Sequence, residues 1–210
     1  MNEPRVEDGI VVGTGSNKYE TKNPIARAAI GQLLNTVSDF ASQCQPDSIL
    51  EVGCGEGHVT ERLLANTGAS VHATDLSQAL VDETSERFAG NDRLKTSQLN
   101  IHELAGDQYR SDLVVCCEVL EHLDQPEDGL ARLARMSKQF AVLSVPREPN
   151  FRILNFLRGQ HFSDFGNAPG HVQHWSARSF TRFVETRFEV LKVKALLPWT
   201  VVLAKPRTGQ

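Results

Sequence analysis

The sequence predicts an α/β fold, in which a mostly parallel seven-stranded sheet lies between two layers of helices and ends in an antiparallel hairpin. Short apolar strands alternate with helical patterns over most of the 210 residues. A glycine-rich loop follows the first predicted sheet strand, and no helical pattern separates the last two strands. Strands that alternate with helices form parallel sheets with right-handed crossovers. The length suits one domain, so residues 1–210 are expected to form a single domain.

The first half of the chain supplies four of the seven strands. Residues 1–23 are rich in Gly, Asn, Thr and charge and are expected to form a mobile lead-in. Pro24 suits the first turn of a helix, and apolar residues then recur at helical spacing. A second helix is expected from about Gly57, and Ser77 is a good N-cap for a third that runs through Phe88. The predicted strands are residues 48–52, 70–74, 94–99 and 112–117.

The second half departs from simple alternation. Pro126 opens a predicted helix that runs through Lys138, and a strand is expected at residues 140–145. Prolines, glycines and aromatic residues in segment 146–175 predict a small inserted cap. Its amphipathic piece FRILNFLRG is expected to cover a binding pocket, to contact a membrane surface or to pack on the sheet. Ser176 then caps a short helix, and strands at 188–195 and 199–205 form the closing hairpin.

Composition limits the class of protein. The hydrophobic and charged fractions, 40% and 23%, are ordinary for a globular protein, and no apolar run approaches membrane-spanning length. The N-terminus is acidic and polar rather than a signal peptide, and the spacing of the four cysteines suggests no zinc site. We therefore expect reduced thiols and a cytoplasmic location. The sequence leaves the oligomeric state open.

The net charge of −4 hides an asymmetry along the chain. The segment from Arg147 to Gln210 contains ten Lys or Arg against four Asp or Glu, and the residues before it contain twelve against twenty-two. Either the solvated faces differ by chance, or the C-terminal third faces an anionic substrate or surface.

The most informative segment is ILEVGCGEGHVTERL, residues 49–63, in which a strand, a glycine loop and a helix follow one another. Glycines permit a tight turn and a close approach of a ligand to the backbone. Glu51 lies two residues before the first glycine, and Asp75 ends the second predicted strand, where a carboxylate can accept both hydroxyls of a ribose. A nicotinamide-dependent dehydrogenase is the rival interpretation. It would normally show G-x-G-x-x-G, whereas the third glycine here comes one residue early, and it would need a second domain.

With these motifs the sequence resembles the class I S-adenosylmethionine-dependent methyltransferases over nearly its whole length, which implies a Rossmann-like three-layer fold. The E-x-G-C-G-x-G loop would hold the methionine part of the cofactor, Asp75 the ribose and Leu76 the adenine. Asn100 and Ile101 would contact the adenine amino group, and the backbone of Cys117 would approach the methionine end. The resemblance therefore assigns the cofactor to Glu51, Gly53, Cys54, Gly55, Gly57, Asp75, Leu76, Asn100, Ile101 and Cys117.

Candidate reaction residues follow the fourth predicted strand in CCEVLEHLDQPE. The spacing of Glu118, Glu121 and His122 predicts one face of a helical turn, where they either bind a divalent ion or are solvated side chains. Glu-x-x-Glu-His resembles the motif of the small-RNA 2′-O-methyltransferases and of the O-methyltransferases of ubiquinone synthesis. In the small-RNA enzymes a further histidine completes the metal site, and His171 matches it in H-x-x-x-W-x-x-x-x-F. Magnesium or manganese suits this set, and zinc is not excluded.

The prediction is an O-methyltransferase that acts on a small molecule or on a lipid- or sugar-linked metabolite. Either His122 or His174 acts as the general base, or a bound ion lowers the pKa of the acceptor hydroxyl. The alternatives are a metal-dependent RNA 2′-O-methyltransferase and a non-catalytic nucleotide-binding module of the same fold. Nucleic acid is the less favoured partner, because the chain is acidic overall and nucleic-acid binding normally needs a strong basic patch.

Overall fold

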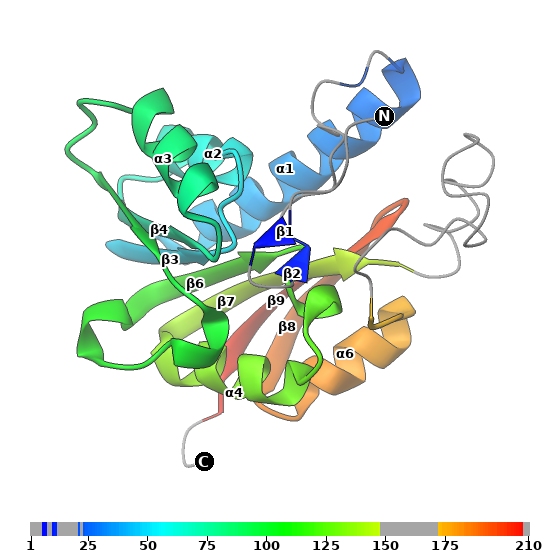
Figure 1. Ribbon diagram of the computed structural model, residues 1–210. Coiled ribbons are helices and arrows are strands. Elements are labelled where there is room, and N and C mark those ends of the chain that lie inside the picture. The colour runs from blue at the N-terminus through cyan, green and yellow to red at the C-terminus, as the bar shows by residue number, and fades with distance from the viewer. Residues whose placement is uncertain (1–5, 8–9, 12–20, 22, 148–171, 208–210) are drawn as a thin grey trace.

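The computed structural model describes residues 6–7, 10–11, 21, 23–147 and 172–207. Its centre is a seven-stranded sheet (Figure 1). The strands are β3 (Ser48–Val52), β4 (Ser70–Asp75), β5 (Leu94–Gln98), β6 (Ser111–Cys117), β7 (Ser137–Pro146), β8 (Phe188–Ala195) and β9 (Trp199–Pro206). They lie in the order β5-β4-β3-β6-β7-β9-β8. The first five are parallel, β9 is antiparallel to β7, and β8 is antiparallel to β9, which confirms the predicted sheet.

Helices cover both faces of the sheet, so the fold has three layers (Figure 1). One face carries α1 (Pro24–Cys44), α2 (His58–Asn66) and α3 (Gln78–Arg87), and the other carries α4 (Pro126–Met136) and α6 (Ala177–Glu185). Three short 3₁₀ turns, η2 (Ile101–Glu103), η3 (Asp107–Tyr109) and η4 (Leu120–His122), lie in the connections. None of the described helices combines the length and apolar character that crossing a membrane requires.

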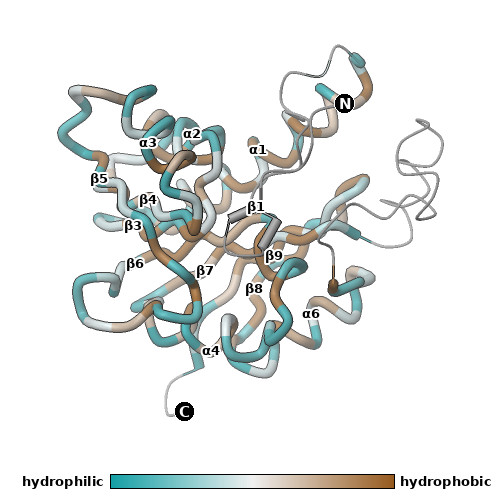
Figure 2. Tube along the Cα trace, in the orientation of Figure 1, coloured by the Kyte–Doolittle hydropathy of each residue, from teal (hydrophilic) through white to brown (hydrophobic). Residues whose placement is uncertain are grey.

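Two apolar cores lie on the two faces of the sheet. In β6, Val115 faces the core under α1 and α2, whereas Val114 and Cys116 face the core under α4 and α6. This alternation follows from the two-residue period of a strand. In Figure 2 the hydrophobic stretches of chain follow the central strands. Because both faces are covered, the strands read as nearly continuous apolar runs in the sequence.

The chain changes direction in the sheet between β3 and β6. It first builds β4 and β5 on one side of β3 and then crosses to β6 and β7 on the other. In open α/β sheets, ligands bind at the carboxyl edge beside the point where the strand order reverses. The fold places the glycine loop after β3 and the acidic segment after β6 at this one edge.

One boundary differs from the sequence prediction. The helix predicted to run through Lys138 ends at Met136, and β7 already begins at Ser137. The hydroxyl of Ser137 donates to the carbonyl of Leu133 at 2.8 Å, and the backbone of Ser137 is extended. This contact ends α4 two residues early and lengthens the strand.

The lead-in and the cap are only partly described. The sequence predicted no strand before Pro24, whereas β1 (Val6–Glu7) and β2 (Ile10–Val11) form a small antiparallel pair. Residues 148–171, with the amphipathic piece FRILNFLRG, lie outside the described residues. Near the two ends of the predicted cap, Arg147 and Trp175 lie side by side in an isolated parallel bridge.

Candidate functional site

The glycine loop joins β3 to α2 and is held against β4. The N–H groups of Gly53 and Cys54 both donate to the carbonyl of Thr74, at 2.8 and 2.9 Å. Gly53, Gly55 and Gly57 have φ values of 83°, 53° and 79°, in the left-handed region that favours glycine. The sequence-predicted loop is therefore present and needs its glycines for backbone conformation.

The three glycines differ in what lies above them. A Cβ atom on Gly53 would lie 2.2 Å from Cγ2 of Val119, and one on Gly57 would lie 2.9 Å from Cε2 of Phe88. A Cβ atom on Gly55 would meet no heavy atom within 4 Å. Gly53 and Gly57 thus permit close packing within the protein, whereas Gly55 leaves open space over the loop that a ligand can occupy.

Asp75 lies beside this open space, at the carboxyl end of β4. Its Oδ2 accepts the N–H of Gly55 at 2.9 Å, and its Oδ1 accepts the N–H of Ser77 at 3.0 Å. A carboxylate offers about four lone-pair sites, so it can accept further hydrogen bonds while it keeps these two. The geometry fits a carboxylate that orients the loop and also receives ligand hydroxyls.

Glu51 is placed differently from the other candidate cofactor residues. Its side chain is only 2% exposed, beneath the loop, and its Oε2 accepts the hydroxyl of Thr60 at 2.6 Å. The pKa of Glu51 is raised to about 8, mainly by burial; the Thr60 hydrogen bond opposes the rise and the nearby Asp75 adds to it. Glu51 is therefore buried and joined to α2 through Thr60.

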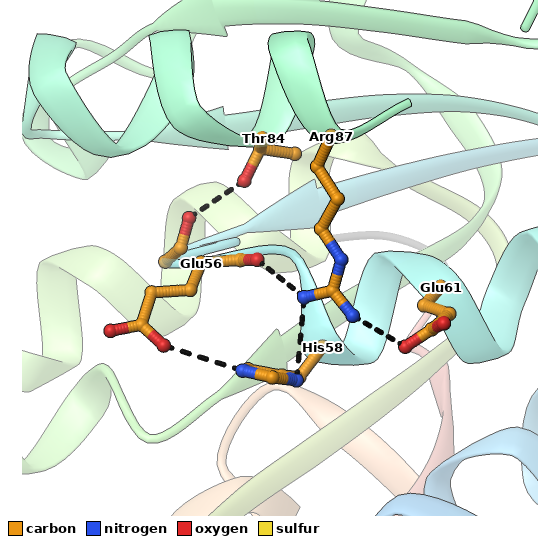
Figure 3. A network of polar contacts seen from close by, with 6 residues as sticks. Glu56, His58, Glu61, Thr84 and Arg87 are labelled. Carbon is orange, nitrogen blue, oxygen red and sulfur yellow. Dashed lines mark hydrogen bonds and ion pairs between the residues drawn. The ribbon is translucent and has the colours of Figure 1, made fainter. Parts of the chain in front are cut away.

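Helix α3 braces the loop through side chains that the sequence analysis did not identify (Figure 3). Thr84 donates to the carbonyl of Gly55 at 2.8 Å, and Nη1 of Arg87 donates to the carbonyl of Glu56 at 2.9 Å. Nη2 of Arg87 also forms an ion pair with Glu61 of α2 at 2.7 Å. The contacts join residues about thirty positions apart, so no local spacing in the sequence indicates them.

The predicted adenine side lies after β4 and β5. The backbone N–H of Leu99 donates to the carbonyl of Asp75 at 2.8 Å, which fixes the end of β5 beside the loop. Asn100 caps η2, where its Oδ1 accepts the N–H of His102 at 2.9 Å, and Ile101 is 6% exposed. Leu76 is half-buried. Asn100 and Ile101 thus follow β5, and the side-chain oxygen of Asn100 already bonds the backbone.

The acidic segment after β6 corrects one prediction. Glu118 does not share a helical turn with Glu121 and His122, because Glu118 has a φ of 62° and η4 begins only at Leu120. Cys117 ends β6 and is half-buried, as is His122 at the end of η4. Oε2 of Glu118 accepts the indole N–H of Trp199 at 2.7 Å, a contact that the sequence analysis did not identify. The helical spacing of these residues in the sequence therefore does not correspond to one helical turn in the structure.

The predicted metal ligands are only partly described. Within residues 23–147 and 172–207, no three His, Cys, Asp or Glu side chains gather as a metal site would require. His171 lies outside the described residues. The N–H groups of Val172 and Gln173 both donate to the carbonyl of Glu121, at 2.9 and 3.0 Å, which brings the segment of the exposed His174 beside η4.

Comparison with known proteins shows that the chain is similar to methyltransferases. A family model described as "Methyltransferase domain" matches residues 50–143. The ribosomal RNA small subunit methyltransferase A of Parasynechococcus marenigrum is 48% identical over 133 residues, 62% of this chain and 42% of that protein. The mitochondrial ubiquinone biosynthesis O-methyltransferase of Schizosaccharomyces pombe is 34% identical over 120 residues, 54% of this chain and 43% of that protein. The chain thus spans about two fifths of the length of these two relatives.

A solved structure extends the similarity of the fold to most of the chain. Magnesium protoporphyrin IX methyltransferase from Synechocystis PCC 6803, with bound SAH, superposes with a TM-score of 0.68 and 18% sequence identity. The match covers 90% of this chain and 91% of that one. At this identity the superposition establishes the fold.

The different surroundings of Gly53 and Gly55 give a testable difference in stability. Gly53→Ala is expected to lower the free energy of unfolding by roughly 2–4 kcal/mol, because a strained φ adds to a clash with Val119. Gly55→Ala is expected to lower the free energy of unfolding by only about 1 kcal/mol, because it brings backbone strain without a clash. Urea unfolding of the two variants measures both values, and equal losses would contradict the described packing.

Glu51 predicts a pH dependence of stability. Its pKa is about 8 in the folded protein and 4.5 ordinarily, so the folded state keeps a proton that the unfolded chain releases. The stabilisation from this proton is complete below about pH 4.5 and is lost as the pH rises through about 8. Glu51→Gln does not ionise and keeps an acceptor for Thr60. Urea titrations at about pH 5 and about pH 8 should show the variant gaining stability relative to wild type at the higher pH. A constant difference between the two proteins would refute the raised pKa.

Proposed function

Because the chain belongs to the class I S-adenosylmethionine-dependent methyltransferase family, we propose that it methylates an oxygen atom of a small molecule or of a lipid- or sugar-linked metabolite. One observation carries the proposal. The open space over Gly55 adjoins the Asp75 carboxylate, and both lie at the carboxyl edge beside the point where the strand order reverses. S-adenosylmethionine, when bound, supplies an activated methyl group on a positively charged sulfur.

The residues of the chain then have separate tasks. The loop of Gly53, Gly55 and Gly57 would hold the methionine part, and the Asp75 carboxylate would accept the ribose hydroxyls. The residues after β5 would contact the adenine. Methyl transfer needs an aligned nucleophile and help with its deprotonation more than covalent catalysis. His122 and His174 are the proposed general bases, because both lie in segments that meet at the carbonyl of Glu121.

RNA is the second candidate acceptor. Two observations favour it: one relative is named as a ribosomal RNA methyltransferase, and Lys and Arg exceed Asp and Glu by ten to four after residue 146. Binding to RNA would weaken steeply with salt, because neutralised phosphates release counterions. An RNA affinity that stays weak even at low salt would contradict RNA as the acceptor and favour the small molecule.

The cofactor assignment is tested by calorimetry with S-adenosylhomocysteine. Asp75→Ala is expected to weaken its binding by about 1.5–3 kcal/mol, because two ribose hydroxyls lose a charged acceptor. Asp82→Ala is the matched control, since it removes an exposed carboxylate from the neighbouring helix. Unchanged affinity in Asp75→Ala would remove Asp75 from the site. Wild-type protein that binds NAD and not S-adenosylhomocysteine would refute the proposed cofactor. If S-adenosylhomocysteine does bind, a methyl-transfer assay distinguishes an enzyme from a non-catalytic binding module.

A divalent ion is a separate part of the proposal, with Glu118, Glu121, His122 and His171 as its ligands. If these four residues bind the ion, EDTA should abolish turnover and leave the affinity for S-adenosylhomocysteine nearly unchanged. Glu121→Ala should then behave as wild type does in EDTA. Full turnover in excess EDTA, with an acceptor known to be methylated, would remove the metal from the mechanism and leave a histidine as the base.

A further inference from the structure

Arg87 is the last residue of α3, and its guanidinium reaches the glycine loop, where it contacts three acceptors (Figure 3). Its Nη1 donates to the carbonyl of Glu56 at 2.9 Å and lies 3.4 Å from Nδ1 of His58. Its Nη2 forms an ion pair with Glu61, in the first turn of α2, at 2.7 Å. The guanidinium therefore ties the end of α3 to the place where the loop becomes a helix.

His58 links the same guanidinium to the side chain of Glu56. An arginine can only donate, so Nδ1 of His58 accepts and the ring proton lies on Nε2. Nε2 is 3.3 Å from Oε2 of Glu56. Burial, and next the positive charge of Arg87, lower the pKa of His58, which keeps the ring neutral and Nδ1 an acceptor. Glu56 is therefore held twice, through its backbone carbonyl and through its carboxylate.

Helix α3 occupies one side of the second half of the loop. Thr84 donates to the carbonyl of Gly55, and a Cβ atom on Gly57 would lie 3.1 Å from Oγ1 of Thr84. The C=O and N–H groups of a planar trans peptide point in opposite directions. The contacts of α3 with the carbonyls of Gly55 and Glu56 therefore fix the orientation of the peptide groups that face the open space over Gly55.

The residues proposed for the nucleoside are held by other contacts. Asp75 accepts the N–H of Ser77 through its side chain and the N–H of Leu99 through its carbonyl. Asn100 accepts the N–H of His102 at the start of η2. The polar contacts of Arg87 lie instead in the loop and in α2. Loss of Arg87 would thus disturb one half of the cofactor site and leave the other half supported.

We infer that Arg87 is a positioning residue that sets the affinity for the amino acid half of S-adenosylmethionine and leaves the affinity for the nucleoside half almost unaffected. The guanidinium acts through the backbone of Glu56 and does not need to contact the ligand. A rigid fork of donors suits this task, because it can hold several acceptors in one geometry. The exposed ion pair with Glu61 adds little energy by itself, so its role is to orient the guanidinium. The inference rests on the proposed function, in which the glycine loop holds the methionine part.

Two ligands separate the halves of the cofactor. S-adenosylhomocysteine contains both halves, whereas 5′-methylthioadenosine keeps the nucleoside and the sulfur and lacks the amino acid group. Arg87→Met keeps an unbranched side chain and removes every donor. It should weaken S-adenosylhomocysteine about fivefold and leave 5′-methylthioadenosine within about twofold of wild type, because only the loop loses hydrogen-bond support. Calorimetry measures the first affinity, and ligand-observed NMR, which extends to millimolar dissociation constants, measures the second.

A conservative variant and a double-variant cycle test whether the effect passes through the guanidinium. Arg87→Lys keeps the positive charge but concentrates its donors at one point, so it cannot serve acceptors on both sides of a planar fork. It should recover part of the affinity for S-adenosylhomocysteine and leave a loss of about twofold. Glu61→Gln should cause a similarly small loss and add nothing in the Arg87→Met background, since Glu61 acts through Arg87.

Arg93 offers a matched control on the same helix. Its guanidinium donates to the carbonyls of Leu64, Thr67 and Ala69 at the C-terminal end of α2. Arg93→Met therefore removes a comparable set of hydrogen bonds far from the loop, and it should leave the affinities for both ligands unchanged. Thermal unfolding of each variant measures the accompanying loss of stability.

The outcomes separate this inference from the proposed function. If the ratio of the two affinities in Arg87→Met equals that of wild type, whether both ligands are retained or both are weakened, the role of Arg87 is overturned and the cofactor assignment stays intact. If wild-type protein binds neither ligand, the proposed function fails and this inference fails with it. If Arg87→Met does not fold, the same ratio measured in Arg87→Lys decides.

Discussion

The site depends on one carbonyl group, that of Thr74 in β4, which accepts the backbone N–H groups of both Gly53 and Cys54. These two bonds turn the chain sharply as it leaves β3 and pin it to the neighbouring strand. This change of direction also brings the N–H of Gly55 to the carboxylate of Asp75. Such a turn requires left-handed backbone at Gly53 and Gly55, where glycine carries little steric cost. The space over the loop is thus a consequence of backbone hydrogen bonding in the sheet.

The same turn couples the two halves of the site. Gly53 has no side chain, and Val119 occupies the position that a Cβ atom would take. The segment after β6 can therefore approach the loop closely enough to place Glu118 beside it. From the side of β4 and β5, α3 holds the loop through Thr84 and Arg87. The loop is consequently clamped between α3 and the turn at Glu118, which is the pre-organisation that a site for positioning a nucleophile needs.

Sequence patterns predicted correctly those element bounds that depend on neighbouring residues in the chain. The bounds of β3 and the start of α6 agree with the sequence prediction, because an apolar run marks the strand and a capping serine precedes the helix. Predictions that depended on spacing alone were less reliable. Glu118, Glu121 and His122 have helical spacing, yet a hydrogen bond from Glu118 to Ser144 keeps the chain on the sheet before η4 begins. The contact of Trp199 with Glu118 joins residues 81 positions apart, and only the strand order brings them together.

The structure shows which contacts some of the C-terminal basic residues make within the fold. Several of the C-terminal basic residues make contacts within the protein. Lys192 donates to Gln43 of α1, the ammonium of Lys205 lies 5.3 Å from the centre of the Phe140 ring, and Arg207 donates to the carbonyls of Glu185 and Phe188. These contacts join the hairpin to the rest of the fold, and because the partners are uncharged, all three exposed residues keep their positive charge. An external anion responds mainly to the charges close to it, so an excess summed along the sequence does not by itself define a binding surface.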